Sequence, residues 1–167
     1  MDDKISLDMD RLWSEVTVYL GDDTRRINHA KSVLEYAQTI LETEKADRET
    51  VESAAMLHDI GIHEAERKYG SSAGHYQELE GPPIARDILK RLNADNALID
   101  HVCRIIASHH SPGEVDTPEF YILWDSDWLV NIPEEYPNAG PEELSCLIEK
   151  VFRTRKGREL ARELLNT

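Results

Sequence analysis

The residues best suited to chemistry are His58 and Asp59, which are adjacent in the segment AAMLHDIG, residues 54–61. On a regular helix, neighbouring side chains point about 100° apart, so an adjacent pair normally cannot share one ligand. Gly61 follows two residues later, and a helix that ends here relaxes this constraint. An imidazole and a carboxylate together suit a divalent cation such as Mn, Fe, Ni, Co or Zn. By itself, the pair is equally compatible with a surface His-Asp dipeptide.

Further candidate ligands lie before and after this pair. His29 lies near the apolar face of a predicted helix, where a hydrogen-bonded core histidine is the ordinary alternative to a ligand. Asp125 and Asp127 lie in the strongly apolar segment ILWDSDWLV, residues 122–130. A buried carboxylate without a partner is costly, so at least one of the two is expected to meet a cation or a donor network. Together with the His-Asp pair, these residues supply two nitrogens and two oxygens and leave coordination positions open for substrate.

The charge of the whole chain narrows the choice of partners. The 167 residues include 33 acidic and 19 Lys or Arg residues, for a formal net charge of -14. This charge repels phosphate backbones and anionic lipid, so we expect neither nucleic acid nor a membrane as a partner. Cys103 and Cys146 do not form a disulfide framework, and the N-terminal residues lack an apolar signal-peptide core. We therefore expect a soluble cytoplasmic protein.

Helices are expected to position the candidate ligands, because apolar residues recur at helical spacing along most of the chain. We predict an all-α, single-domain fold of about seven helices over residues 1–167. The chemical motifs lie within about 24–132, and residues 133–167 are predicted to be a helical extension. Thr24 and Thr117 are the predicted N-caps of the helices that carry His29 and the two aspartates.

One stretch of the chain lacks a regular pattern. Residues 62–80 are predicted to be an extended loop with one short helix at most, and Pro82-Pro83 to begin the next helix. The polar segment GHYQELEGPP, residues 74–83, is a candidate lid over the site, and a solvated connection is the alternative.

The order of the motifs resembles the HD-domain metal-dependent phosphohydrolases over roughly residues 24–132. In this comparison His29 is the first histidine, AAMLHDIG the HD motif, and RIIASHH, residues 104–110, the second histidine-bearing helix. ILWDSDWL, residues 122–129, matches an aspartate motif that commonly reads D-A-D-x-L, with the second aspartate as the ligand. The resemblance implies that the metal ligands are His29, His58, Asp59 and Asp127, with Asp125 in reserve. It is specific for fold and metal site and far less so for substrate.

Residues near the ligands in the sequence are also expected to take part in the chemistry. Asp59 and His109 are expected to be catalytic, and Arg26, Arg104 and His110 to bind substrate; a solvated surface charge is the alternative for each arginine. We expect one divalent ion per chain (Mn, Fe, Ni, Co, Zn or Mg) rather than two.

Two features leave the chemistry open. Some relatives bind two metals through additional histidines, for which the candidates here are His63, His75, His101, His109 and His110. Some nucleotidase relatives have an acidic residue three positions after the HD aspartate, where this chain has Ile62. No general acid is therefore assigned, although Glu64, Glu78 or Glu80 would be chemically suitable.

The function expected from these motifs is hydrolysis of a small phosphomonoester or phosphodiester, such as a nucleotide, by metal-activated water. The expected partner is therefore a small phosphorylated molecule. The apolar faces of the first and last helices are compatible with a homodimer. The alternatives are a di-iron oxygenase and a non-catalytic module that senses a small ligand.

Overall fold

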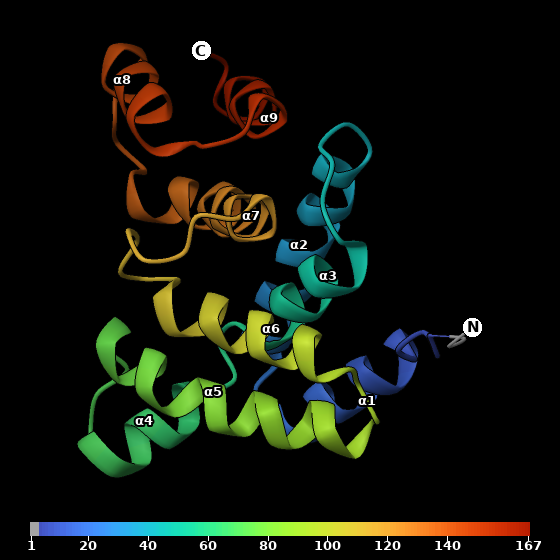
Figure 1. Cartoon of the computed structure of the whole chain (residues 1–167). Helices are drawn as coiled ribbons and strands as arrows, with labels where there is room; N and C mark the ends of the chain where they lie inside the picture. The colour runs from blue at the N-terminus through green and yellow to red at the C-terminus, as the bar shows by residue number, and fades with distance from the viewer. Residues whose placement is uncertain (1–3) are drawn as a thin grey trace.

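The computed structural model describes residues 4–167, in which helices are joined by turns and short connections and no strand is present (Figure 1). The prediction of an all-α fold is confirmed, with nine helices in the described residues where about seven were predicted. In chain order, these helices are α1 (Met9–Leu20), α2 (Thr24–Leu41), α3 (Arg48–Leu57), α4 (Ile62–Tyr69), α5 (Gly74–Arg91), α6 (Asn96–Ser108), α7 (Pro118–Glu135), α8 (Pro141–Val151) and α9 (Arg155–Leu165). None of them has the length and hydrophobicity that crossing a membrane requires.

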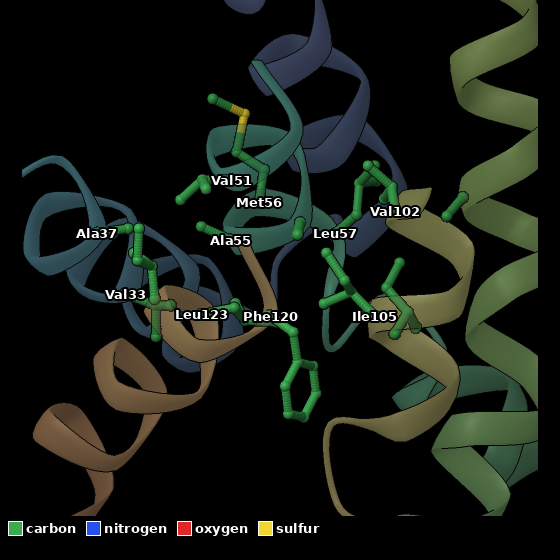
Figure 2. Packing of buried hydrophobic residues seen from close by; sticks show 14 of the residues in the cluster. Val33, Ala37, Val51, Ala55, Met56, Leu57, Val102, Ile105, Phe120 and Leu123 are labelled. Atoms are coloured by element: carbon green, nitrogen blue, oxygen red, sulfur yellow. The ribbon is translucent and has the colours of Figure 1, made fainter. Parts of the chain in front are cut away.

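Helix α3 forms the centre of the packing, and every residue from Thr50 to Leu57 is buried. Figure 2 shows its side chains meeting those of three other helices. The contacting residues include Val33 and Ala37 of α2, Val102 and Ile105 of α6, and Phe120 and Leu123 of α7. Because α3 is held on several sides, the turn that follows it is carried into the interior, where the His-Asp pair lies.

The predicted extended loop over residues 62–80 is wrong, and the candidate lid, residues 74–83, is helical rather than a loop. Residues 62–69 form α4, and α5 runs without a break from Gly74 through Pro82 and Pro83. Each proline removes its own N–H donor and crowds the carbonyl of the preceding turn, and packing of α5 against α4 and α6 offsets this cost and the weak helical tendency of the segment.

Two helix boundaries in the C-terminal half and one near the N-terminus also depart from expectation. The predicted helical extension, residues 133–167, forms two helices, α8 and α9, and α7 continues through Pro133 to Glu135 into the start of that range. Thr117 caps α7 as predicted, whereas the N-cap of α2 is Asp23, whose carboxylate accepts from Arg26 N.

The turn between α3 and α4 lies directly against α5 through two glycines. A Cβ atom built on Gly61 would lie 2.5 Å from the backbone nitrogen of Gly81 and 2.9 Å from the carbonyl oxygen of Gln77. Backbone atoms cannot rotate away as a side chain can, so only glycine fits this contact.

Gly61→Ala is therefore expected to lower the free energy of unfolding by about 2 kcal/mol or more, as overpacking of a tight interior does. Urea denaturation followed by circular dichroism measures this change. Gly140→Ala is the control, because a Cβ atom added to Gly140 would have no atom within 4 Å, and it is expected to cost less than about 1 kcal/mol. Equal effects of the two substitutions would contradict the packing argument.

Candidate metal centre

Four side chains from three parts of the fold meet at one point, and we call them the ligand cluster: His29, His58, Asp59 and Asp127. His29 comes from the middle of α2 and Asp127 from the middle of α7. His58 and Asp59 lie in the turn that follows α3, where the backbone has left the regular helix. Both heads of the pair can therefore reach the same point.

The distances within the ligand cluster match those between ligands of one ion. His29 Nε2 lies 3.1 Å from Asp127 Oδ1, 3.2 Å from Asp59 Oδ2 and 3.2 Å from His58 Nε2. His58 Nε2 lies 3.4 Å from the same two carboxylate oxygens. Ligand atoms that are each about 2.0–2.2 Å from one divalent ion lie about 3.0–3.5 Å apart. The donor set therefore fits a divalent cation.

The orientation of His58 is fixed by its other ring nitrogen. Nδ1 lies 2.8 Å from the carbonyl oxygen of Ala55, which can only accept, so Nδ1 carries the proton and donates. In the neutral ring the lone pair is then on Nε2 and points into the ligand cluster. A backbone acceptor of this kind commonly orients a metal-ligating histidine.

The electrostatics of the ligand cluster favour a positive charge at its centre. Burial alone would lower the pKa of His58, but the adjacent Asp59 and Asp127 carboxylates outweigh it and hold this pKa well above its usual range. Burial likewise opposes ionisation of Asp127, yet its hydrogen bonds with His29 and His58 hold the pKa of this carboxyl below its usual range. A divalent cation would meet the same demand without protonating an imidazole.

A second group of potential ligands adjoins the first through Asp59. One ligand atom from each of Asp59, His109 and His110 lies within 4.8 Å of the others. Nδ1 of His109 donates to the carbonyl oxygen of Ile106 at 2.6 Å, so its buried Nε2 faces Asp59 Oδ1 at 3.4 Å without a hydrogen bond. Asp59 therefore offers one oxygen to each group, and the arrangement can accommodate a second ion.

A cavity of about 630 Å³, which we call the polar cavity, opens onto the ligand cluster. Arg25 and Arg26 are the basic residues among those lining it in the described chain, and they lie one turn before His29 on α2. His110 also lines it and contacts Gln77 Oε1 through Nε2 at 3.1 Å. Burial, with a smaller contribution from His109, lowers the pKa of His110 to about 4, so this ring is neutral near pH 7.

A model of the HD domain family matches residues 26–164 of this sequence. The chain belongs to the HD-domain family. Its structure is similar to the crystal structure, at 1.45 Å resolution, of a predicted HD superfamily hydrolase from an uncultured Thermotogales bacterium, with a TM-score of 0.69 and 25% identity. The likeness covers 94% of this chain and 84% of that one. Among curated proteins, none matches the sequence.

The fold does not bring every predicted site residue of this HD domain to the ligand cluster. Arg26 and His110 line the polar cavity, whereas Arg104 lines a separate hollow with Arg86 and Asp100. His109 and His110, which directly follow the end of α6, lie next to the cluster, whereas Arg104 within α6 does not. Arg104 precedes these histidines by five and six residues, and this spacing alone did not show that it faces away from the cluster.

The remaining histidines considered as ligands of a second metal, and the acidic residues considered as general acids, contact other residues instead. His63 contacts Asp23, His101 contacts Thr117, and His75 packs on Tyr76. The acidic candidates also lie outside the polar cavity: Glu64 pairs with Arg67 and Lys68, Glu80 with Lys68 and Tyr69, and Glu78 with Ser111.

A row of polar residues on α7 was not predicted from the sequence. Asn131 and Glu135 follow Asp127 at helical spacing, and all three line the polar cavity together with Glu134. Asn131 Nδ2 donates to Asp127 Oδ1 at 3.0 Å, so it holds the carboxylate in place. Spacings of four and eight residues on one helix were a signal that could have identified this row.

Adding a divalent metal to the chelated protein is expected to stabilise it. At a free metal concentration about 100 times Kd, mass action adds about 2.7 kcal/mol, which for a chain of this size raises Tm by about 5–10 °C. Differential scanning fluorimetry with Mn²⁺, Ni²⁺, Zn²⁺ and Mg²⁺ measures the shift. His58→Ala is expected to lose most of it, and an equal shift in this variant would argue that the ion binds elsewhere.

Proposed function

We propose that this HD-domain protein is a metal-dependent hydrolase of a small phosphate ester. The observation that carries the proposal is the convergence of the ligand cluster at the floor of a cavity that also contains two arginines. Membership of the HD-domain family and the likeness to a predicted HD superfamily hydrolase support the same general kind of activity.

His29, His58, Asp59 and Asp127 would hold the divalent ion. Bound there, the ion would polarise a phosphoryl oxygen and make a water molecule more acidic. Arg25 and Arg26 are available to bind the remaining phosphoryl oxygens, because a guanidinium matches phosphate geometry. Arg26 is held only loosely by Glu66, at 4.0 Å, and is free to exchange that partner for a substrate.

In the proposed reaction, water forms a new bond to phosphorus and the bond from phosphorus to the ester oxygen breaks. A proton from the water goes to the departing alkoxide oxygen. A monoester therefore yields an alcohol and inorganic phosphate. Asp59, with one oxygen towards each group of potential ligands, lies where it can orient the water. Buried His109, directly beside Asp59, is available to interact with the substrate or to hold the carboxylate in position.

The test begins with chelated protein that is reloaded separately with Mn²⁺, Fe²⁺, Co²⁺, Ni²⁺, Zn²⁺ or Mg²⁺. Phosphate release from a broad panel of monoesters, and hydrolysis of bis(p-nitrophenyl) phosphate, are then measured. The proposal expects multiple turnover with at least one metal and none with the chelated protein. A protein that binds metal stoichiometrically but turns over none of these esters would contradict it and favour a sensing module.

The second group of ligands supports one alternative function, a di-iron oxygenase. It would use Asp59 as the bridge and His109 with His110 on the second iron. Aerobic and anaerobic iron loading followed by metal analysis and Mössbauer spectroscopy separates the cases. Two coupled irons per chain would favour the oxygenase, whereas a single ion would exclude it.

A further inference from the structure

A second hollow of about 180 Å³ adjoins the polar cavity, and we call it the tryptophan cavity. Four of its lining residues also line the polar cavity: His110, Asp127, Asn131 and Glu135. Those that line only the smaller hollow are His109, Trp124 and Trp128. Because Asp127 borders both spaces, a molecule that reacts at the ligand cluster can extend into either of them.

Aromatic rings form a large part of the wall of the tryptophan cavity. The ring centroids of Trp124 and Trp128 are 6.2 Å apart and the rings are inclined at 53°. The Trp124 indole N–H donates to the carbonyl oxygen of Val151 at 3.1 Å, which fixes this ring. Trp128 is stacked with Tyr136 at a centroid distance of 6.4 Å. The two indoles are therefore held at an angle by partners outside the cavity.

The charges around the two spaces differ. The arginines, Arg25 and Arg26, line the polar cavity, while the described lining of the tryptophan cavity contains neither Lys nor Arg. That lining does include the carboxylate of Glu135, together with Asp127, whose charge would be engaged by the ion of the ligand cluster. The Arg153 guanidinium lies over the Trp124 ring, 5.8 Å from its centroid, and lines a different hollow, so one face of this indole already has a cation against it. The face of an indole ring next to a carboxylate binds a cation favourably and an anion poorly.

We propose that the tryptophan cavity binds a positively charged alkylammonium group of the substrate. Resting on the proposed phosphate-ester hydrolysis, this inference identifies the substrate class as phosphate esters of amino alcohols. The phosphate would lie by the arginines and the ligand cluster, and the ammonium group between Trp124, Trp128 and Glu135.

The size and the polar groups of the cavity favour this occupant over a nucleobase. An apolar cavity of about 150 Å³ holds a guest the size of benzene, so about 180 Å³ accepts a trimethylammonium group. Reading a base edge requires free donors and acceptors. Of the lining polar groups, Asn131 Nδ2 already donates to Asp127 Oδ1 and His109 Nε2 has no hydrogen bond, whereas an alkylammonium group needs only aromatic ring faces and a negative charge.

The first experiment measures binding separately from turnover. Metal-loaded protein carrying Trp13→Phe is titrated with choline and with 3,3-dimethyl-1-butanol, its neutral counterpart of the same shape. The chain has three tryptophans, so the tryptophan fluorescence, excited selectively, then comes from Trp124 and Trp128. Choline is expected to bind at least about tenfold more tightly than the neutral alcohol. Equal binding of the two, no binding of either, or tighter binding of adenosine would overturn the inference.

Matched variants assign that preference to the tryptophan cavity. Each of two substitutions, Glu135→Gln and Trp128→Leu, is expected to raise the Kd for choline about five- to tenfold. In Glu135→Gln the Kd for the neutral alcohol is expected to stay nearly unchanged. Glu134→Gln is the control, because Glu134 lines the polar cavity but not the tryptophan cavity. Loss of binding that is equal in Glu134→Gln and Glu135→Gln would contradict the assignment.

The second experiment compares kcat/KM for phosphocholine with that for 3,3-dimethylbutyl phosphate. A preference for phosphocholine that Glu135→Gln abolishes supports the inference. Hydrolysis of both esters at equal rates would overturn the substrate class while leaving the proposed hydrolase standing. Selective choline binding without hydrolysis of any ester would instead contradict the hydrolase and leave the cation-binding cavity supported.

Discussion

Replacing Asp127 by Asn is expected to lower kcat/KM for a hydrolysed phosphate ester on the order of 10³-fold. The substitution removes the negative charge of a carboxylate whose Oδ1 lies 3.1 and 3.4 Å from the two histidines of the ligand cluster, and it replaces one carboxylate oxygen by an NH₂ group that cannot bind a metal ion. A metal ion contributes several kcal/mol of transition-state stabilisation, and about 4 kcal/mol corresponds to on the order of 10³-fold in rate. Steady-state kinetics at saturating metal, together with metal content per chain, measures the effect.

The matched control for Asp127→Asn is Glu134→Gln, which removes a carboxylate from the same cavity and the same helix but not from the ligand cluster. It is expected to change kcat/KM by less than about tenfold, as expected for an exposed charge. Circular dichroism verifies that both variants are folded. Full turnover by Asp127→Asn with normal metal content would rule out this aspartate as a ligand.

Replacing Asp125 by Ala is expected to lower the free energy of unfolding by about 3–5 kcal/mol. Asp125 is completely buried and accepts from Arg153 N at 2.8 Å, from Thr154 N at 2.7 Å and from the Thr154 hydroxyl at 2.6 Å. Each buried donor left without a partner costs about 1–3 kcal/mol. The substitution also frees the turn that joins α8 to α9. Urea denaturation at constant metal concentration measures the loss.

Asp125→Asn separates the contributions of shape and hydrogen bonding. Its amide fills the same space and retains one acceptor, but its NH₂ group faces donors, so an intermediate loss is expected. Metal affinity, measured below the unfolding temperature, is expected to change far less in either Asp125 variant than in Asp127→Asn. A loss of under about 1 kcal/mol in Asp125→Ala would show that Asp125 does not anchor this turn.

These two aspartates show the limit of reasoning from sequence. Residue pattern indicated that at least one of the two had to meet a cation or a donor network, and the resemblance favoured Asp127. The fold brings Asp127 to the ligand cluster and directs Asp125 to the α8–α9 turn. The helix α7 turns about 200° over two residues, so the two carboxylates point to opposite sides. Which side faces the histidines depends on packing against α2 and α3.

The glycines and prolines between residues 62 and 91 show the same limit in the secondary structure. Locally, Gly74, Gly81 and the two prolines favour a break, and a loop was predicted. In the fold, Gly81 lies against Gly61, and a Cβ built on Gly74 would lie 2.8 Å from the His110 ring. The glycines therefore serve close approach of α5 to its neighbours. Such contacts join residues far apart in sequence and leave no periodic signal.

Helical periodicity and the order of the HD motif with His29 and Asp127 were sufficient to determine the all-α class and the family of this protein, because both are local properties of the chain. The tertiary structure alone decided what surrounds the ligand cluster: arginines on one side, two tryptophans and Glu135 on the other, and Arg104 excluded. These neighbours come from helices α2, α6 and α7, whose relative rotation is determined by side-chain packing rather than by the pattern within any one helix.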